Sequence, residues 1–499
     1  MALFSTDPLK SLQTQLDNAT TYQEWRSIAE RMDELEGLDD WKAEDKCDDY
    51  SWRLLRNRLT ELRQLRANND VRELVYWLHE GLHGNLGNMA NPVLYQHARV
   101  GTKNIVTEYI TEVAEALEWI CDNDFEELPF GEKIRFFKRT AKCYGRSGLL
   151  LSGGATLGMF HIGVCQALFE EGLLPRVISG SSAGSIIAGA ICAHTDEEIP
   201  AFFDPEYLYL QAFRTHGIRH AFRNKSIMDG KQLSHCLQEN IGDLSFEEAF
   251  ERTGRILNIP ISAVASNQMP RLMNYLTGPN VLIRTASLAS CAIPAVFPPV
   301  RLLAKDVDGH IVPYLPTLKW SDGSLTSDLP MLRLARLHDV NHYVVSQVNP
   351  HVAPFMSKKK VKTRSGLFGM ARGITRTTVE ANTKEFLEIA KNSVDHPLAK
   401  RALGEAHKML NQQYYGDVTV IPKFDPRLFA KVLSNPTPKD IEAFVDAGIR
   451  QTWPEIERMR NAMLISQTFE SCIHKLKLKA HQTPAGPEQK TAQTMKQVG

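Results

Sequence analysis

Residues 176–190 read Arg176-Val177-Ile178-Ser179-Gly180-Ser181-Ser182-Ala183-Gly184-Ser185-Ile186-Ile187-Ala188-Gly189-Ala190. The segment starts with a β-prone apolar run, passes through Gly-x-Ser-x-Gly and continues as small residues that suit a closely packed helix. Small residues on both sides of a serine allow the sharp strand-to-helix turn that lifts its hydroxyl above a sheet edge. The pattern therefore predicts Ser182 as a nucleophile, with Gly180 and Gly184 required by the turn.

A glycine-rich segment lies about one strand and one helix upstream, and it reads Gly148-Leu149-Leu150-Leu151-Ser152-Gly153-Gly154-Ala155-Thr156-Leu157-Gly158. It predicts a buried strand, a glycine turn and a helix over about 159–171. N–H groups at such a helix start are free to hold a phosphate or an oxyanion. A dinucleotide loop would need Gly-x-Gly-x-x-Gly and a P-loop would need a lysine after Gly158, where Met159 stands. A tight turn without function is the plain alternative.

A serine hydroxyl needs a base, because it is a weak nucleophile at neutral pH. Asp322 is the candidate, in the segment Lys319-Trp320-Ser321-Asp322-Gly323-Ser324. An isolated Asp-Gly pair is more often a turn whose aspartate caps its own backbone. The apolar approach to this pair and the Leu-Pro segment that follows favour a role at the site.

These three segments, in this order and spacing, resemble the patatin-like phospholipase family. The apolar run over 286–299 is similar to the family's segment before its Asp-Gly turn. The resemblance implies a three-layer α/β/α sandwich with a mainly parallel sheet, flanked here by helical regions. It implies a Ser-Asp dyad without histidine, with Ser182 as nucleophile and Asp322 as base. The resemblance also implies that N–H groups of the glycine loop hold the oxyanion, at Gly153, Gly154 and Ala155, with Gly158 and Gly323 as further motif positions.

The N-terminal region narrows the resemblance to fungal and plant triacylglycerol lipases with a helical domain before the patatin domain. The segments at 82–89 and 158–164 carry this likeness, which covers about residues 10 to 460. The sequence departs from the usual patatin pattern at two places, which affect the expected preference for a phospholipid head group more than the Ser-Asp dyad. Thr156-Leu157 stands where many patatins have a basic residue, and Ser324 stands where Gly or Ala is commoner.

The 499 residues exceed what one hydrophobic core usually supports, and we expect three parts. Helical spacing such as Leu55, Leu59 and Leu62 predicts an N-terminal helical domain over 1–145. Alternating β-prone and Gly-punctuated helical segments predict an α/β catalytic domain over 146–350. A helical region with a disordered tail is expected over 351–499, with one strand at 418–421.

Bulk composition limits the partners and the compartment. The formal net charge is zero, so no overall charge favours nucleic acid. The eight cysteines are scattered without paired spacing, which favours reduced thiols. Without a secretory signal or an apolar run long enough to span a bilayer, we expect a cytoplasmic protein that touches a membrane or lipid droplet from one side. A basic segment with interleaved apolar residues over 358–376 is a candidate for that contact, or a mobile loop.

Two other kinds of hydrolase site compete with the dyad. His79-Glu80-Gly81-Leu82-His83 matches the zinc motif H-E-x-x-H, but Gly81 weakens the helix that the motif needs. A Ser-Asp-His triad could use one of three histidines after Asp322, at positions His338, His342 and His351.

The expected function is a lipid acyl hydrolase, either a triacylglycerol lipase or a phospholipase, that cleaves a glycerolipid ester through an acyl-enzyme without metal or cofactor. One alternative is a lysophospholipid acyltransferase that uses the same site with an alcohol in place of water. The other is a non-catalytic lipid-binding scaffold, against which the intact serine and aspartate argue.

Overall fold

The computed structural model describes residues 8–204, 207, 228–264, 270–293, 296–323, 328–349, 415–423, 432 and 434–482. The chain divides into two compact units. One comprises residues 1–146 with 457–499, and the other comprises residues 147–456. The predicted limits of 1–145, 146–350 and 351–499 remain a prediction, because much of the last region lies outside the described residues.

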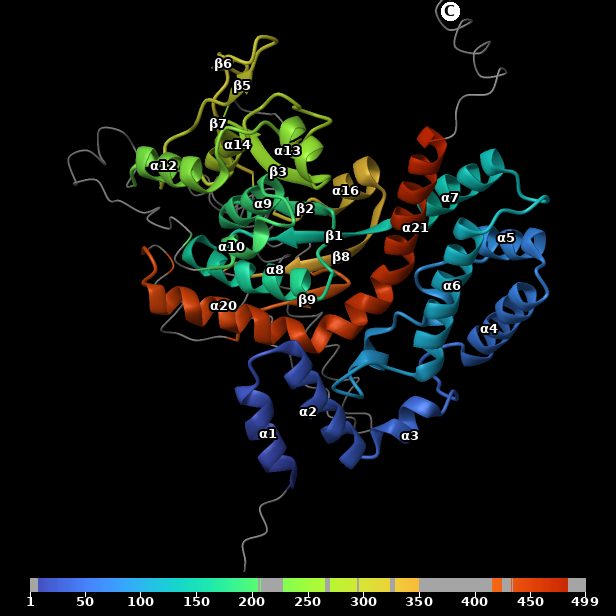
Figure 1. Cartoon of the computed structure of the whole chain (residues 1–499). Coiled ribbons are helices and arrows are strands. Elements are labelled where there is room, and N and C mark those ends of the chain that lie inside the picture. The colour runs from blue at the N-terminus through green and yellow to red at the C-terminus, as the bar shows by residue number, and fades with distance from the viewer. Residues whose placement is uncertain are drawn as a thin grey trace, which may run out of the picture. The chain divides into compact units, whose positions relative to one another are not determined.

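The first unit is helical in the part that is described (Figure 1). In α4, Leu55, Leu59 and Leu62 recur at helical spacing and are buried, so this helix packs through one apolar face. The C-terminal helix α21 belongs to the same core, since its Phe469 packs edge-on against Phe137 of α7 at a centroid distance of 6.1 Å. The elements are α1 (Pro8–Asn18), α2 (Tyr22–Leu35), α3 (Leu38–Ala43), α4 (Trp52–Ala67), α5 (Val71–Glu80), η1 (Leu86–Asn88), η2 (Pro92–Tyr95), α6 (Asn104–Asp122), α7 (Phe130–Tyr144) and α21 (Ile456–Gln482).

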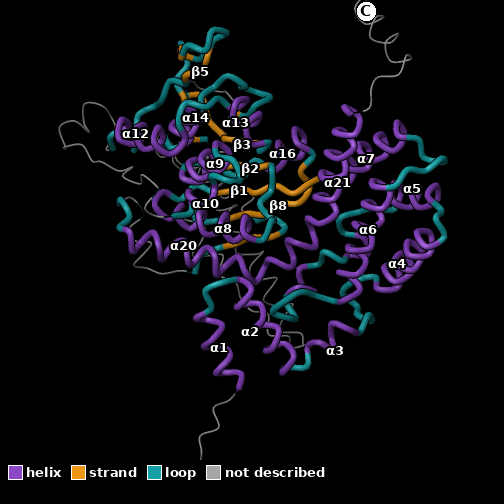
Figure 2. The backbone as a smooth tube through the Cα atoms, viewed as in Figure 1, coloured by secondary structure: helices purple, strands orange, loops and turns teal. Residues whose placement is uncertain are grey.

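The second unit is built on a mixed sheet with helices around it (Figure 2). Its strands are β1 (Arg146–Leu151), β2 (Val177–Gly180), β3 (Ile256–Ala263), β4 (Arg271–Met273), β5 (Leu303–Lys305), β6 (Ile311–Pro313), β7 (Trp320–Asp322), β8 (Val340–Ser346) and β9 (Val418–Val420). Its helices are η3 (Ala155–Met159), α8 (Phe160–Glu170), α9 (Ala183–Ala193), α10 (Ile199–Phe202), α12 (Gly230–Ile241), α13 (Phe246–Thr253), α14 (Ile283–Ser290), α16 (Met331–His338), α20 (Pro438–Thr452) and η5 (Trp453–Glu455).

The main sheet has the strand order β4-β3-β2-β1-β8-β9, and the pairs β1 with β2, β2 with β3, and β8 with β9 are parallel. Its central strands are buried on both faces, which explains why β1 is a continuous apolar run rather than an alternating one. Helix α16 packs on one face, where its Leu334 meets Leu150 and Val177 in one cluster. Helices α9 and α14 contact the sheet through β2 and β3. The predicted α/β sandwich with helical flanks is confirmed.

Strand β3 pairs with β2 and β7 along the same edge, and this pairing determines the position of Asp322. Ile261 pairs with Arg271 of β4 on one edge and with Asp322 of β7 on the other. Nearer the amino end of β3, the same second edge pairs with β2, where Ser179 is opposite Asn258. Strand β7 therefore continues beyond the carboxyl end of β2. That is the point at which the chain turns through Ser182.

No helix in the described part of the chain combines the length and the apolar character that a bilayer crossing requires.

Candidate active site

The strand-to-helix turn at Ser182 has an unusual backbone. Strand β2 ends at Gly180, α9 begins at Ala183, and Ser182 between them has φ +49° and ψ −122°. A side-chain-bearing residue pays about 1–3 kcal/mol for such a conformation and keeps it only where its surroundings enforce it. A Cβ on Gly180 would lie 2.2 Å from the Gly184 carbonyl oxygen, and one on Gly184 would lie 2.3 Å from the Leu151 carbonyl oxygen. Both glycines are therefore required by close backbone contacts.

Two buried serines hold Ser182 in this conformation. The Ser182 N–H donates to Ser290 Oγ at 3.0 Å, and Ser290 Oγ donates to the Pro260 carbonyl oxygen at 3.1 Å. From the other side, Ser185 Oγ donates to the Ser182 carbonyl oxygen at 2.6 Å. The turn is therefore tied to α14, β3 and α9 at once.

Asp322 lies at the end of β7 and is 3% exposed. Its N–H donates to the Ala292 carbonyl oxygen at 3.1 Å, which fixes the strand end beside the residues after α14. A Cβ on the next residue, Gly323, would lie 2.8 Å from Ile261 N, so the chain can leave β7 here only as glycine.

The Cys291 thiol connects the two predicted dyad residues. Burial raises the pKa of this thiol, and the nearby Asp322 carboxylate raises it further. The nearby Ser185 and Ser182 side chains act in the opposite direction on the same pKa. Ser182 and Asp322, 140 positions apart in the sequence, are thus neighbours of one buried thiol.

The glycine loop follows β1 and lies against the serine turn. A Cβ on Gly153 would lie 3.4 Å from Ser182 Cβ, and one on Gly158 would lie 2.6 Å from Ala183 Cβ. A Cβ on Gly154 would lie 2.5 Å from Val348 Cγ2. The segment therefore approaches the serine turn at Gly158, and the residues after β8 at Gly154, too closely for side chains at these two glycines.

The three N–H groups predicted to hold the oxyanion differ in whether they already donate a hydrogen bond within the protein. The Gly153 N–H donates to Asp328 Oδ1 at 3.0 Å, so it is already engaged. Among the residues that the structure describes, none accepts a hydrogen bond from the Gly154 or Ala155 N–H. Ala155 starts η3 with φ +50°, a second non-glycine residue in the left-handed region at this site. The geometry favours Gly154 and Ala155 as oxyanion donors.

No pattern in the sequence indicates that Asp328 belongs to the site. This carboxyl is 2% exposed, and burial raises its pKa to about 7 against the hydrogen bonds that it accepts. In the sequence it stands six residues after Asp322 and directly after Thr326-Ser327, which is an ordinary setting for a solvent-exposed aspartate. Only its contacts with distant segments distinguish it.

The histidines of the triad alternative are held elsewhere where they are described. His342 Nδ1 lies 2.9 Å from the hydroxyl of Ser147, near the amino end of β1, whereas the serine turn lies beyond the carboxyl ends of the strands. His338 Nε2 lies 3.0 Å from Asn258 Oδ1 in a buried network. His351 lies outside the described residues.

The zinc motif does not form a ligand group. Helix α5 ends at Glu80, so His79 and His83 do not share a helix face. His79 Nδ1 instead lies 3.2 Å from Glu80 Oε1 at the surface. In the described part of the chain, the side chains close enough together to bind a metal are Asp306, Asp308 and His310, all exposed.

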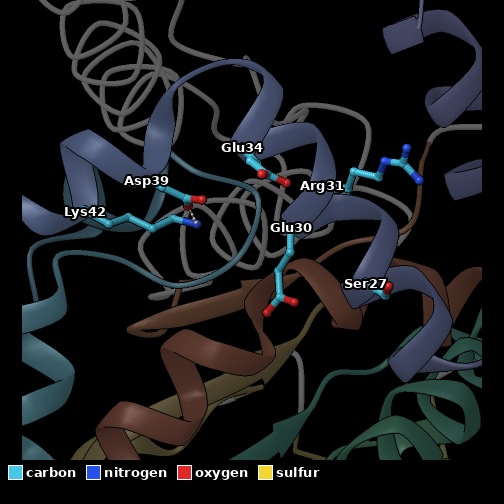
Figure 3. A pocket seen from close by; sticks show the side chains of 6 residues that line it. All are labelled: Ser27, Glu30, Arg31, Glu34, Asp39 and Lys42. Carbon is cyan, nitrogen blue, oxygen red and sulfur yellow. Dashed lines mark hydrogen bonds and ion pairs between the residues drawn. The ribbon is translucent and has the colours of Figure 1, made fainter.

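A polar cavity of about 460 Å³ opens on the helical unit between α2 and α3 (Figure 3). Two of its charged groups pair with each other, since Lys42 Nζ lies 3.3 Å from Asp39 Oδ1, and Lys42 Nζ also lies 3.2 Å from Asp33 Oδ2. Such a lining does not suit an acyl chain, and we assign this cavity no part in the chemistry. The lining residues are Ser27, Glu30, Arg31, Glu34, Asp39 and Lys42.

Two family models match the chain. Residues 149–335 match the model described as "Patatin-like phospholipase", and residues 4–142 match "Domain of unknown function (DUF3336)". The first model covers the glycine loop, the serine turn and Asp322. The second covers most of the N-terminal helices.

Three curated relatives are similar along most of the chain. Triacylglycerol lipase SDP1L of Arabidopsis thaliana is 34% identical over 91% of this chain and 57% of its own length. Triacylglycerol lipase 4 of Saccharomyces cerevisiae is 36% identical over 90% of this chain and 51% of its own length. This chain therefore spans little more than half of these two relatives. Triacylglycerol lipase ptl3 of Schizosaccharomyces pombe is 32% identical over 93% of this chain and 98% of its own length.

Proposed function

The chain belongs to the patatin-like phospholipase family, and from that membership we propose that it is a lipid acyl hydrolase in which Ser182 is the nucleophile and Asp322 the general base. The observation that carries the proposal is the strained backbone of Ser182, which two buried serines hold at the carboxyl end of β2, where β7 also brings Asp322. Strain of this kind is concentrated at functional sites.

In the proposed reaction, Asp322 takes the proton of the Ser182 hydroxyl while Oγ bonds to the ester carbonyl carbon. The Gly154 and Ala155 N–H groups hold the negative charge that develops on the carbonyl oxygen. Collapse breaks the ester bond, and the leaving alcohol receives the proton from Asp322. Water then attacks the acyl-enzyme by the same route and releases the fatty acid, which regenerates the serine.

We propose triacylglycerol as the substrate class, because the three relatives described above are named triacylglycerol lipases. The test is fatty-acid release from triacylglycerol emulsion and from phospholipid vesicles by wild type, Ser182→Ala and Asp322→Asn. Ser27→Ala, at an exposed serine of the helical unit, is the matched control.

Wild type and Ser27→Ala are expected to release fatty acid faster from the emulsion than from vesicles. Both dyad variants are expected to lose about 10³-fold or more in rate. Faster release from vesicles would replace triacylglycerol with phospholipid as the substrate. Acyl transfer to a lysophospholipid at the expense of hydrolysis would favour the acyltransferase, and no turnover by wild type would favour the scaffold.

We also propose that the protein works in the cytoplasm at the surface of a membrane or lipid droplet. The supporting observation is the β5–β6 hairpin, which projects from its unit (Figure 1). It exposes Val307 completely, and the exposed apolar residues Ile311, Val312 and Leu315 follow within eight positions. An exposed Val307 in a protruding turn, followed by exposed apolar side chains, suits shallow contact with a lipid surface. The basic segment over 358–376 lies outside the described residues.

A Val307→Ser/Ile311→Ser double variant tests this contact. Its rate on triacylglycerol emulsion is expected to fall about tenfold, while its rate on a soluble short-chain ester stays unchanged, because only the first substrate requires an interface. Val93→Ser, at an exposed valine of the helical unit, is the control. Equal rates on the emulsion, or an equal loss on both substrates, would count against the hairpin as the contact.

A further inference from the structure

Asp328 joins three segments that are far apart in the sequence. Its Oδ1 accepts the Gly153 N–H at 3.0 Å, and its Oδ2 accepts Asn349 Nδ2, just after β8, at 2.9 Å. Its main-chain carbonyl oxygen accepts the Ser181 hydroxyl at 2.6 Å. One residue thereby bonds to the glycine loop, the serine turn and the segment after β8.

We propose that Asp328 is a positioning residue that sets the oxyanion loop against the nucleophile turn. The proposal rests on the hydrolase function proposed above. Gly153 directly precedes Gly154 and Ala155, and Ser181 directly precedes Ser182. The side chain of Asp328 holds Gly153, next to the oxyanion donors, and its main chain holds Ser181, next to the nucleophile. The distance from the oxyanion donors to the attacking hydroxyl therefore depends on this residue.

The carboxylate form is the one that suits these contacts. Both of its oxygens face N–H donors, and a charged acceptor binds such donors more strongly than a neutral one. A proton on either oxygen would replace an acceptor by a donor opposite an existing N–H group.

This arrangement links loop position to pH. Burial raises the pKa of Asp328 to about 7, and the hydrogen bonds from Gly153, Asn349 and Ser181 counteract that rise. The described groups that bond to the carboxyl oxygens are a main-chain N–H at the end of β1 and an amide after β8, neither of which titrates, and the Ser181 hydroxyl after β2 bonds to the main-chain carbonyl oxygen of the same residue. As the pH falls through about 7, Asp328 takes up a proton, its hold on Gly153 weakens and turnover falls. Asp322, the proposed base, must also be ionised, and its titration adds a second acid limb.

The experiment compares wild type with Asp328→Asn, Asp328→Ala and Ser182→Ala on a soluble short-chain ester, from about pH 5.5 to about pH 9. Asp328→Asn keeps the size and one acceptor oxygen but cannot titrate. Asp243→Asn is the matched control, because this partly exposed aspartate bonds to Arg284 and Gln238 rather than to the glycine loop or the serine turn. Melting temperatures show whether each variant is folded.

Asp328→Ala is expected to lower kcat about a hundredfold with KM within about threefold, since displaced oxyanion donors affect the transition state more than substrate binding. Asp328→Asn is expected to lower kcat about tenfold at pH 8 and to lose the acid limb near pH 7. If Asp328→Ala does not fold, Asp328→Asn alone decides.

Two results overturn the proposal, and they differ in what else they affect. If wild type turns over and Ser182→Ala does not, but Asp328→Asn keeps both the wild-type kcat and the limb near pH 7, the positioning role is wrong and the hydrolase remains. If wild type shows no turnover that depends on Ser182, the hydrolase proposal is wrong and the positioning role goes with it.

Discussion

The strained backbone conformation of Ser182 is stabilised by the hydrogen bonds that its main chain makes. The strained φ of +49° costs about 1–3 kcal/mol, and this cost is offset by two hydrogen bonds with buried serines: the Ser182 N–H donates to Ser290 Oγ, and the Ser182 carbonyl oxygen accepts from Ser185 Oγ. The hydroxyl side chain is left outside these bonds. The turn is thus a fixed platform for the Ser182 Oγ rather than a flexible loop that must find its geometry during turnover.

His342→Ala separates the dyad from a triad at the same scale. The imidazole of His342 is bonded to Ser147 near the amino end of β1, so its removal is expected to change kcat on a soluble ester by about twofold or less. Loss of a triad histidine would instead cost about 10⁴-fold or more. A loss of that size would make His342 the base and leave Asp322 as its orienting partner.

Helices α8 and α20 meet backbone to backbone. A Cβ on Gly163 of α8 would lie 1.9 Å from the Val445 carbonyl oxygen, and one on Gly448 of α20 would lie 2.3 Å from the Phe160 carbonyl oxygen. Just before α20, the carbonyl oxygens of Val432 and Ser434 accept the Thr156 N–H at 3.1 Å and the Thr156 hydroxyl at 2.6 Å. Residues beyond the matched patatin region therefore support the glycine loop.

Gly163→Ala tests this contact between elements. The added methyl group must separate the two helices, so we expect a destabilisation of about 3 kcal/mol and a lower kcat, because the loop leads directly into α8. The control is Gly131→Ala in α7, where a Cβ would meet open space and alanine favours the helix by up to about 1 kcal/mol. Melting temperatures that shift equally in the two variants would show that the close approach is not rigid.

The sequence predicted the elements that are determined locally. The β1 run, the glycine turn, α8 and the Gly-x-Ser-x-Gly turn depend on neighbouring residues, and their positions agree with the structure. Asp322 was predicted as a partner through its turn and the family resemblance. The contacts of Ser290 and Asp328 were not predictable from local patterns, because each bonds to a segment more than 100 positions away.

On the scale of the whole chain, the C-terminal helix packs with the N-terminal helices. Phe469 of α21 is 1% exposed between Phe137 and Tyr144, with both ring centroids 6.1 Å away. Cys472, one turn further on, lies in the same core. Helical periodicity shows which face of α21 is apolar but does not identify its partner, so this pairing across more than 300 residues was not predicted.

Phe469→Ala is expected to leave a cavity and cost about 3–5 kcal/mol, confined to the helical unit. Hydrogen exchange measured by mass spectrometry should show lost protection in α6 and α7, with α8 and α9 unchanged. Loss of protection in all four helices would show that the two units unfold as one.

Labelling of the protein with a fluorophosphonate, followed by mass spectrometry of the modified peptide, tests the dyad most directly. The probe reacts with a serine only when a base activates the hydroxyl and donors hold the oxyanion-like centre. We expect a single label on Ser182 in wild type, and labelling about 10³-fold slower in Asp322→Asn. A label on another serine, or an undiminished rate in Asp322→Asn, would contradict the proposed pairing of Ser182 with Asp322.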